Sequence, residues 1–157
     1  MCLVMYDPAP GPETAVLATI NEVPRAFFRL AAVADALFAD LGVSPGERGV
    51  MRDLFIDGED TAPSLALKKP VSRQAMQAIL DELVGKGLVA ATENPRHKRS
   101  RLYYLTPKGI ELCVELQRRE LAAIREMIGE AGSADFATAA AALKALNALL
   151  ARRLNIA

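Results

Sequence analysis

Residues 61–109 read TAPSLALKKPVSRQAMQAILDELVGKGLVAATENPRHKRSRLYYLTPKG, and this stretch decides the fold. Thr61 and Ser72 are helix-capping residue types, and each precedes an apolar segment. After Ser72 the apolar positions follow the spacing of one helical face until Gly87: Met76, Ile79, Leu80 and Leu83. The pattern therefore predicts two short helices joined by a tight turn.

After this second helix the periodicity changes to that of extended chain. Residues 88–93 and 102–105 are rich in strand-forming side chains, and they flank the turn-rich, strongly basic stretch 94–101. Thr106-Pro107 then begins a long helix. Two helices, a basic β-hairpin and a further helix, in this order, are typical of a winged helix-turn-helix, whose second helix enters the DNA major groove.

The residues before this stretch also have helical patterns. Residues 1–12 contain three prolines and no periodicity, which predicts a loose arm. Pro24 either kinks the helix that follows or starts a second one, Gly42 ends it, and Ser44-Pro45-Gly46-Glu47 is a capping box that opens a short helix. The stripe of this N-terminal helix consists of Val16, Ile20, Val23, Phe27, Leu30, Ala34, Leu37 and Leu41.

At the C-terminal side, Gly129 and Gly132 are expected to end the long helix, and Ser133 to start the last one. We therefore expect a mainly α fold with a small β-hairpin wing: a winged helix-turn-helix plus N- and C-terminal dimerisation helices. The expected division within one compact subunit is an arm at 1–12, a dimerisation helix region at 13–43, the DNA-binding region at 44–108 and dimerisation helices at 109–157.

The composition supports a soluble globular protein. The chain has 157 residues, of which 52% are hydrophobic and 24% charged, about the size of one domain. Charges interrupt every apolar run, so no membrane span is expected, and the start lacks the basic region of a secretory signal. Cys2 and Cys113 suggest no disulfide framework. We expect a cytoplasmic protein in which both cysteines are ordinary thiols.

The formal net charge of zero hides a strong asymmetry. Residues 1–67 carry 4 Lys and Arg against 10 Asp and Glu, a net charge of −6. Residues 68–108 carry 9 against 3, a net charge of +6, and residues 109–157 carry 6 against 6. A basic segment in an otherwise acidic or neutral chain indicates binding to a polyanion, and a solvated basic face is the alternative.

The helical geometry assigns candidate DNA contacts. The base-reading candidates are Arg73, Gln74, Gln77 and Ala78, since glutamine can pair with adenine and alanine can touch a thymine methyl. The candidates for the DNA backbone or minor groove are Ser72, Lys68, Lys69, Arg96, His97, Lys98, Arg99 and Arg101. Ordinary exposed helix residues are the alternative for Gln74 and Gln77.

Enzymatic functions find little support. A single histidine and two distant cysteines do not make a zinc ligand set, and an exposed basic loop is no place for a catalytic base. The glycines do not follow a strand in the pattern of a phosphate-binding loop. We therefore expect no catalytic residues, no metal and no cofactor.

Several motifs in this frame resemble the MarR family of bacterial transcriptional regulators over residues 27–157. They are Leu65-Ala66, Val71–Gln74, Leu83–Val89, Asn94–Ser100 and Leu105–Gly109. The wing differs from many of these proteins, which have an Asp-Arg-Arg-like core where His97, Lys98 and Arg99 stand here. The acidic residue that braces a wing arginine in those proteins is therefore missing.

The resemblance implies a homodimer that binds a pseudo-palindromic operator in double-stranded DNA, acting as a repressor. It also implies release by a small aromatic or phenolic molecule, with pocket candidates Phe27, Phe28, Met51, Phe55 and Tyr103. Some members sense peroxides through a cysteine near the N-terminus, but Cys2 lacks an activating neighbour in sequence. A winged-helix module that docks an acidic protein partner through its basic wing is the alternative function.

Overall fold

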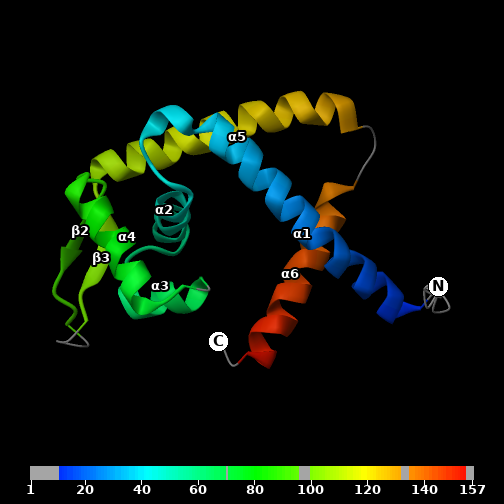
Figure 1. Cartoon of the computed structure of the whole chain (residues 1–157), viewed down its shortest axis with the longest axis horizontal. Coiled ribbons are helices and arrows are strands. Elements are labelled where there is room, and N and C mark those ends of the chain that lie inside the picture. Colours follow the sequence, from blue (N-terminus) through cyan, green and yellow to red (C-terminus); the bar gives the residue numbers. More distant parts are fainter. Residues whose placement is uncertain (1–10, 70, 96–99, 132–134, 155–157) are drawn as a thin grey trace, which may run out of the picture. The chain divides into compact units, whose positions relative to one another are not determined.

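The computed structural model describes residues 11–69, 71–95, 100–131 and 135–154 (Figure 1). The chain divides into two compact units, residues 1–42 and residues 43–157. The expected mainly α fold with a small sheet is confirmed.

The first unit contains one long helix. Helix α1 spans Pro12–Leu37 and runs through Pro24, so no second helix starts there. Helix α1 ends at Leu37 and not directly before Gly42 as expected, because a short 3₁₀ helix at Ala39–Leu41 follows it. Gly42 ends this 3₁₀ helix with a φ of 66°. This positive φ is one that glycine adopts without steric strain. Most of the expected arm, residues 1–10, lies outside the described residues.

The second unit contains the helix-turn-helix and the sheet. Its helices are α2 (Pro45–Asp57), α3 (Ala62–Lys68), α4 (Arg73–Gly85), α5 (Pro107–Ala131) and α6 (Phe136–Arg153). Its strands are β1 (Asp60–Thr61), β2 (Val89–Thr92) and β3 (Leu102–Leu105).

The helix starts follow the capping residues. The predicted capping box is confirmed: the Ser44 hydroxyl accepts a hydrogen bond from the Glu47 backbone N–H, and the Glu47 carboxylate accepts one from the Ser44 N–H. Thr61 caps α3 and Ser72 caps α4 through their hydroxyls. Thr106 caps α5, since its hydroxyl accepts from the Gly109 N–H at 3.1 Å. Each of these residues satisfies a backbone donor that a helix start leaves open.

The sheet has three antiparallel strands in the order β1-β3-β2. Two of them, β2 and β3, form the predicted hairpin, with Ala91 opposite Tyr103. The two-residue strand β1 was not predicted, and it pairs with the other edge of β3, with Asp60 opposite Tyr103. The β3 strand is therefore the central strand of the sheet.

The core of the second unit lies where the recognition helix meets its neighbours. Helix α4 packs against α2, α3 and β2, and α2 also packs against α5 and β3. The largest fully buried side chains among the described residues are Val50, Met51, Leu65, Met76, Leu80, Leu83 and Val89. Their burial fixes which face of α4 points inward.

The last helix begins at a different residue than expected. Asp135 is the N-cap of α6, and its carboxylate accepts hydrogen bonds from the hydroxyl and the backbone N–H of Thr138. These bonds favour the charged form, so the pKa of Asp135 is lowered. The expected starting residue, Ser133, lies outside the described residues, as does Gly132. Gly129 belongs to α5 and does not end it.

Candidate nucleic-acid interface

The first turns of α4 carry the exposed polar residues expected of a recognition helix. Ser72 fixes the start of the helix, since its hydroxyl accepts a hydrogen bond from the Ala75 N–H at 3.1 Å. Arg73, Gln74 and Ala78 are exposed, while Met76 is fully buried. These three side chains are therefore accessible on the surface of the protein, where a ligand can contact them.

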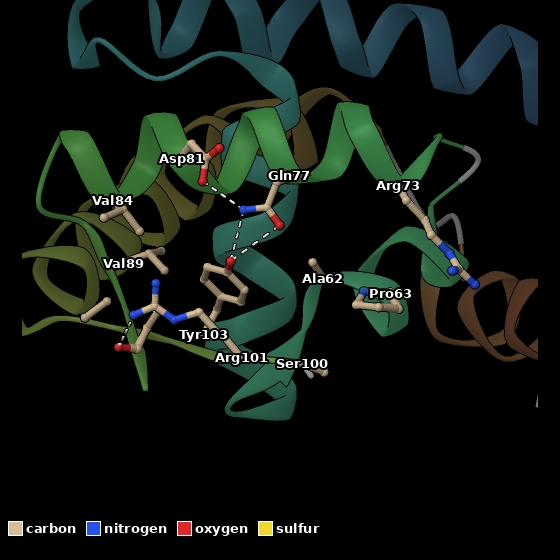
Figure 2. Close-up of a pocket in the computed structure, with 12 residues that line it drawn as sticks. Ala62, Pro63, Arg73, Gln77, Asp81, Val84, Val89, Ser100, Arg101 and Tyr103 are labelled. Carbon is tan, nitrogen blue, oxygen red and sulfur yellow. Dashed lines mark hydrogen bonds between the residues drawn. The ribbon is translucent and has the colours of Figure 1, made fainter. Parts of the chain in front are cut away.

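Gln77 differs from the other three base-reading candidates. Its side chain is half-buried, and its amide nitrogen lies 2.8 Å from Asp81 Oδ1 and 3.0 Å from the Tyr103 hydroxyl (Figure 2). Asp81 is one turn further along α4, and Tyr103 lies on β3. The structure thus joins Gln77 to the sheet rather than leaving it free.

A cavity of about 630 Å³ lies between α4, the start of α3 and the hairpin strands. In Figure 2 the Tyr103 ring lies beneath Gln77, with Arg73 toward one end and Arg101 toward the other. Ala62 and Ser100 also line it. The cavity therefore opens beside the face of α4 that carries the candidate readers.

The two lysines before α4 are held by acidic side chains of the same unit. Lys68 Nζ lies 2.7 Å from Asp57 Oδ2 and 3.1 Å from Asp60 Oδ2, and Lys69 Nζ lies 2.9 Å from Asp53 Oδ2. The hydrogen bond to Asp57 raises the pKa of Lys68 most, and burial opposes it. These contacts compensate the charge of both lysines, so a phosphate would compete with carboxylates already in place.

Much of the basic wing lies outside the described residues, namely Arg96, His97, Lys98 and Arg99. Arg101 is described and exposed, and its guanidinium donates a long hydrogen bond of 3.4 Å to the Ala91 carbonyl. In the described part of residues 68–108, Arg73 and Arg101 make no ion pair, in contrast to Lys68, Lys69 and Lys86. Their charge remains available to an anion.

The five effector-pocket candidates are divided between the two compact units. Phe27 and Phe28 pack edge to face on α1 and are 63% and 70% exposed in the first unit. Met51 is fully buried in the core, and Phe55 is 40% exposed on the same helix. Tyr103 lines the cavity beside α4. Their assignment to an effector site stays a prediction.

Cys113, the cysteine within the described residues, shows no sign of a reactive site. Cys113 is buried, with its sulfur 3.8 Å from the Met51 carbonyl oxygen, and burial raises the pKa of its thiol despite the nearby Arg52. A raised pKa keeps a thiol protonated and slow to react. Cys2 lies outside the described residues.

The part of the chain that the structure describes offers no metal-binding cluster. It contains no group of three His, Cys, Asp or Glu side chains placed to hold a metal ion. Among the same residues, no helix has both the length and the hydropathy required to cross a bilayer.

Sequence reasoning missed the link between Gln77, Asp81 and Tyr103. Gln77 and Asp81 have the i, i+4 spacing at which side chains contact each other on a helix. This spacing could have predicted the hydrogen bond between them from the sequence. The contact with Tyr103 spans 26 positions and depends on the packing of the sheet under α4. No local pattern indicates it.

No family model matches the chain, and no curated protein matches it by sequence. Solved structures do match. The crystal structure of a MarR family transcription regulator has 25% sequence identity and a TM-score of 0.71, covering 92% of this chain and 96% of its own. The transcriptional regulator BldR from Sulfolobus solfataricus has 19% identity and a TM-score of 0.71, covering 91% and 99%.

A third match is a mutant of MarR from E. coli in complex with operator DNA, with 19% identity, a TM-score of 0.65 and coverage of 92% of this chain and 99% of that one. These neighbours are transcription regulators and not enzymes. Each of the three aligns with more than nine tenths of this chain. The chain has the winged helix-turn-helix fold of the MarR family of transcription regulators.

Proposed function

We propose that this protein is a sequence-specific DNA-binding transcriptional regulator that binds a pseudo-palindromic operator as a homodimer and represses transcription. The observation that carries the proposal is the N-terminal half of α4, where Arg73, Gln74 and Ala78 are exposed while Met76 and Leu80 are buried. Such a helix, at the start of a segment of net charge +6, has the form of a major-groove reader.

The exposed residues of α4 and of the wing contact different parts of the DNA. Gln74 and Ala78 contact base edges, and Arg73, in the first turn, reaches a guanine edge or a phosphate. Arg101 and the basic residues 96–99 of the wing contact the DNA backbone or the minor groove. The family resemblance supports the further proposal that a small aromatic or phenolic molecule releases the protein from its operator.

Salt titration tests the function itself. The probe is a duplex that the protein selects from random sequences, and binding to it should weaken steeply as salt rises, because each phosphate contact releases a condensed counterion. Arg99→Ala should lower the slope of log affinity against log salt by about one per subunit on specific and random duplexes alike. Stoichiometric capture of an acidic protein, with no affinity for any duplex, would instead support the interaction module.

Gln74→Ala is expected to weaken operator binding by about 1–3 kcal/mol and to relax the preference at one position in each half-site. The reason is that a glutamine that pairs with a base stabilises the complex with duplexes that carry this base and not the complex with other duplexes. The measurement is duplex affinity for the operator and for each single-base variant of it.

The matched control is Gln117→Ala, which removes the same side chain from an exposed position on α5. It should leave affinity and base preference unchanged. A uniform loss by Gln74→Ala on all duplexes would make this residue a positioning contact and not a reader.

The apolar surface of the first unit supports the homodimer. Helix α1 has no buried residue, and its large apolar side chains are 41–70% exposed: Val16, Leu17, Ile20, Val23, Phe27, Phe28, Leu30 and Val33. Helix α6 also has no buried residue and exposes Phe136, Leu143, Leu149 and Leu150. Apolar helix surface of this extent is typical of subunit contacts.

Light scattering at micromolar concentration is expected to give twice the subunit mass of 16.9 kDa. Substituting charge into the stripe, as in Phe27→Glu with Ile20→Glu, should shift the protein toward the monomer, since two ionised carboxylates would be buried on association. A wild-type protein that scatters as a monomer would contradict the proposed assembly.

The matched control places two carboxylates on the polar side of the same helix. Ala18 and Arg29 are exposed and lie, at helical spacing, on one face with Glu22 and Arg25. Ala18→Glu with Arg29→Glu should therefore remain a dimer. Dissociation of both double variants would show that added negative charge alone, and not loss of the apolar stripe, separates the subunits.

A further inference from the structure

The side-chain amide of Gln77 is committed to contacts within the protein. Its nitrogen has two hydrogens, and two acceptors lie within hydrogen-bond distance: Asp81 Oδ1 at 2.8 Å and the Tyr103 hydroxyl at 3.0 Å. Bidentate pairing with adenine requires one of these hydrogens for the base. Gln77 would therefore have to give up a contact with the protein in order to read a base.

The carboxylate of Asp81 determines which way the amide faces. An ionised carboxylate only accepts hydrogen bonds, so the nitrogen and not the oxygen of the Gln77 amide must point toward it. The same nitrogen then lies 3.0 Å from the Tyr103 hydroxyl oxygen, whereas Gln77 Oε1 lies 3.5 Å from it. Asp81 thus holds the amide in the orientation that meets Tyr103.

Tyr103 connects this contact to the wing. It is 6% exposed and lies on the central strand β3, opposite Asp60 of β1 and Ala91 of β2. Its ring lies beneath Gln77, at the side of the cavity between α4 and the hairpin (Figure 2). The strand continues from Arg101, at the base of the wing, so a displacement of Tyr103 would move that part of the wing.

We infer that Gln77 is a positioning residue which, through Tyr103, fixes the wing strands relative to the recognition helix, and that base reading belongs to Arg73, Gln74 and Ala78. This inference rests on the proposed function and deepens it. Helix and wing contact different parts of one DNA site, so their mutual alignment determines whether both sets of contacts form together. The bond between Gln77 and Tyr103 supplies that alignment.

The test compares Tyr103→Phe and Gln77→Met with the wild type. Tyr103→Phe removes only the hydroxyl, and Tyr104→Phe is the matched control, because Tyr104 is the next residue of the same strand and is 41% exposed. We expect Tyr103→Phe to weaken operator binding about 5- to 10-fold and to lower the salt slope by about one per subunit, with an unchanged preference at every base pair. Tyr104→Phe should bind like the wild type.

Double variants separate alignment from a general loss of structure. Tyr103→Phe with Gln77→Met should bind no more weakly than either single variant, since both remove the same bond. Tyr103→Phe with Arg101→Ala should lose less operator affinity than the two single losses added together. The reason is that Tyr103→Phe alone already misaligns the wing, so that less of the Arg101 contact remains to be removed. Circular dichroism at the assay temperature should show folded protein in each case.

Two results would overturn the inference and leave the proposed function intact. One is wild-type affinity and salt slope for Tyr103→Phe. The other is a relaxed preference at a single base pair for Gln77→Met, which would make Gln77 a reader. Failure of the wild-type protein to bind any duplex would instead reject the proposed function itself.

Discussion

Gly109→Ala is expected to destabilise the second unit by about 3 kcal/mol. A Cβ at position 109 would lie 2.0 Å from the carbonyl oxygen of Leu88, 3.0 Å from its carbonyl carbon and 3.1 Å from Leu105 Cδ2. The Leu88 carbonyl has little freedom to move, because it accepts a hydrogen bond from the Thr106 N–H at 3.0 Å. Overpacking against backbone is among the most costly kinds of substitution.

Helix propensity alone predicts the opposite sign. Alanine is better than glycine inside a helix by about 1 kcal/mol, so an unobstructed glycine would give a more stable variant. Gly85→Ala is the matched control, since a Cβ at this position of α4 meets nothing within 4 Å. Denaturant unfolding at fixed protein concentration should show a large loss for Gly109→Ala and no loss for Gly85→Ala. Equal stabilities would contradict the close approach of α5 to Leu88.

Lys86→Ala is expected to destabilise the protein by about 2–3 kcal/mol at neutral pH. Lys86 Nζ lies 2.6 Å and 2.8 Å from the two carboxylate oxygens of Glu47, whose side chain is only 5% exposed. Removing the lysine leaves this buried carboxylate with the hydrogen bond that it accepts from the Ser44 N–H. An unpaired buried charge is costly, and the partial exposure of Lys86 keeps the loss below that of a fully buried pair.

The effect should depend on pH in a defined direction. Burial raises the pKa of Glu47, but the hydrogen bonds from Lys86 and Ser44 outweigh it, so the pKa lies below its ordinary value of 4.5. A carboxyl whose pKa is lowered by folding stabilises the fold above its unfolded pKa, and this contribution is lost as the pH falls through the folded pKa. The difference between Lys86→Ala and the wild type should therefore be largest above pH 4.5 and shrink in acid.

Arg118→Ala provides the contrast for this experiment. Arg118 is 68% exposed, and its partner Glu115 keeps a hydrogen bond from Arg119 at 2.8 Å. The unfolding midpoint of the Arg118→Ala variant should match that of the wild type. A loss for Lys86→Ala that stays constant from neutral pH into acid would show that the lysine stem, and not its charge, stabilises the unit.

The sequence predicted those parts of the fold that depend on local chemistry. The capping residues Ser44, Ser72 and Thr106 act through backbone groups three positions away, so the sequence pattern contains the whole interaction. The apolar face of α4 was predicted for the same reason, since its spacing is that of a helix. The exposed positions of Arg73 and Gln74 follow from it.

Features that depend on distant residues could not be predicted. Strand β1 has two residues, too few for an alternating pattern, and it forms because β3 offers a free edge more than 40 positions later. Lys68 and Lys69 are predicted from the sequence as contacts to the DNA backbone or minor groove, and the structure pairs them with Asp57 and Asp53 of α2. Charge counted along a sequence does not reveal such neutralisation in space.

The pairing of β1 with β3 has a consequence for exchanging parts between related proteins. A wing transplanted as residues 88–105 alone would lose its third strand, because Asp60 and Thr61 lie before α3. The same transplant would need a glycine in the recipient helix wherever the Leu88 carbonyl approaches it. The unit of exchange is therefore discontinuous in sequence, comprising the hairpin, the dipeptide before α3 and the first turn of α5, and a chimera that respects it should retain the host fold.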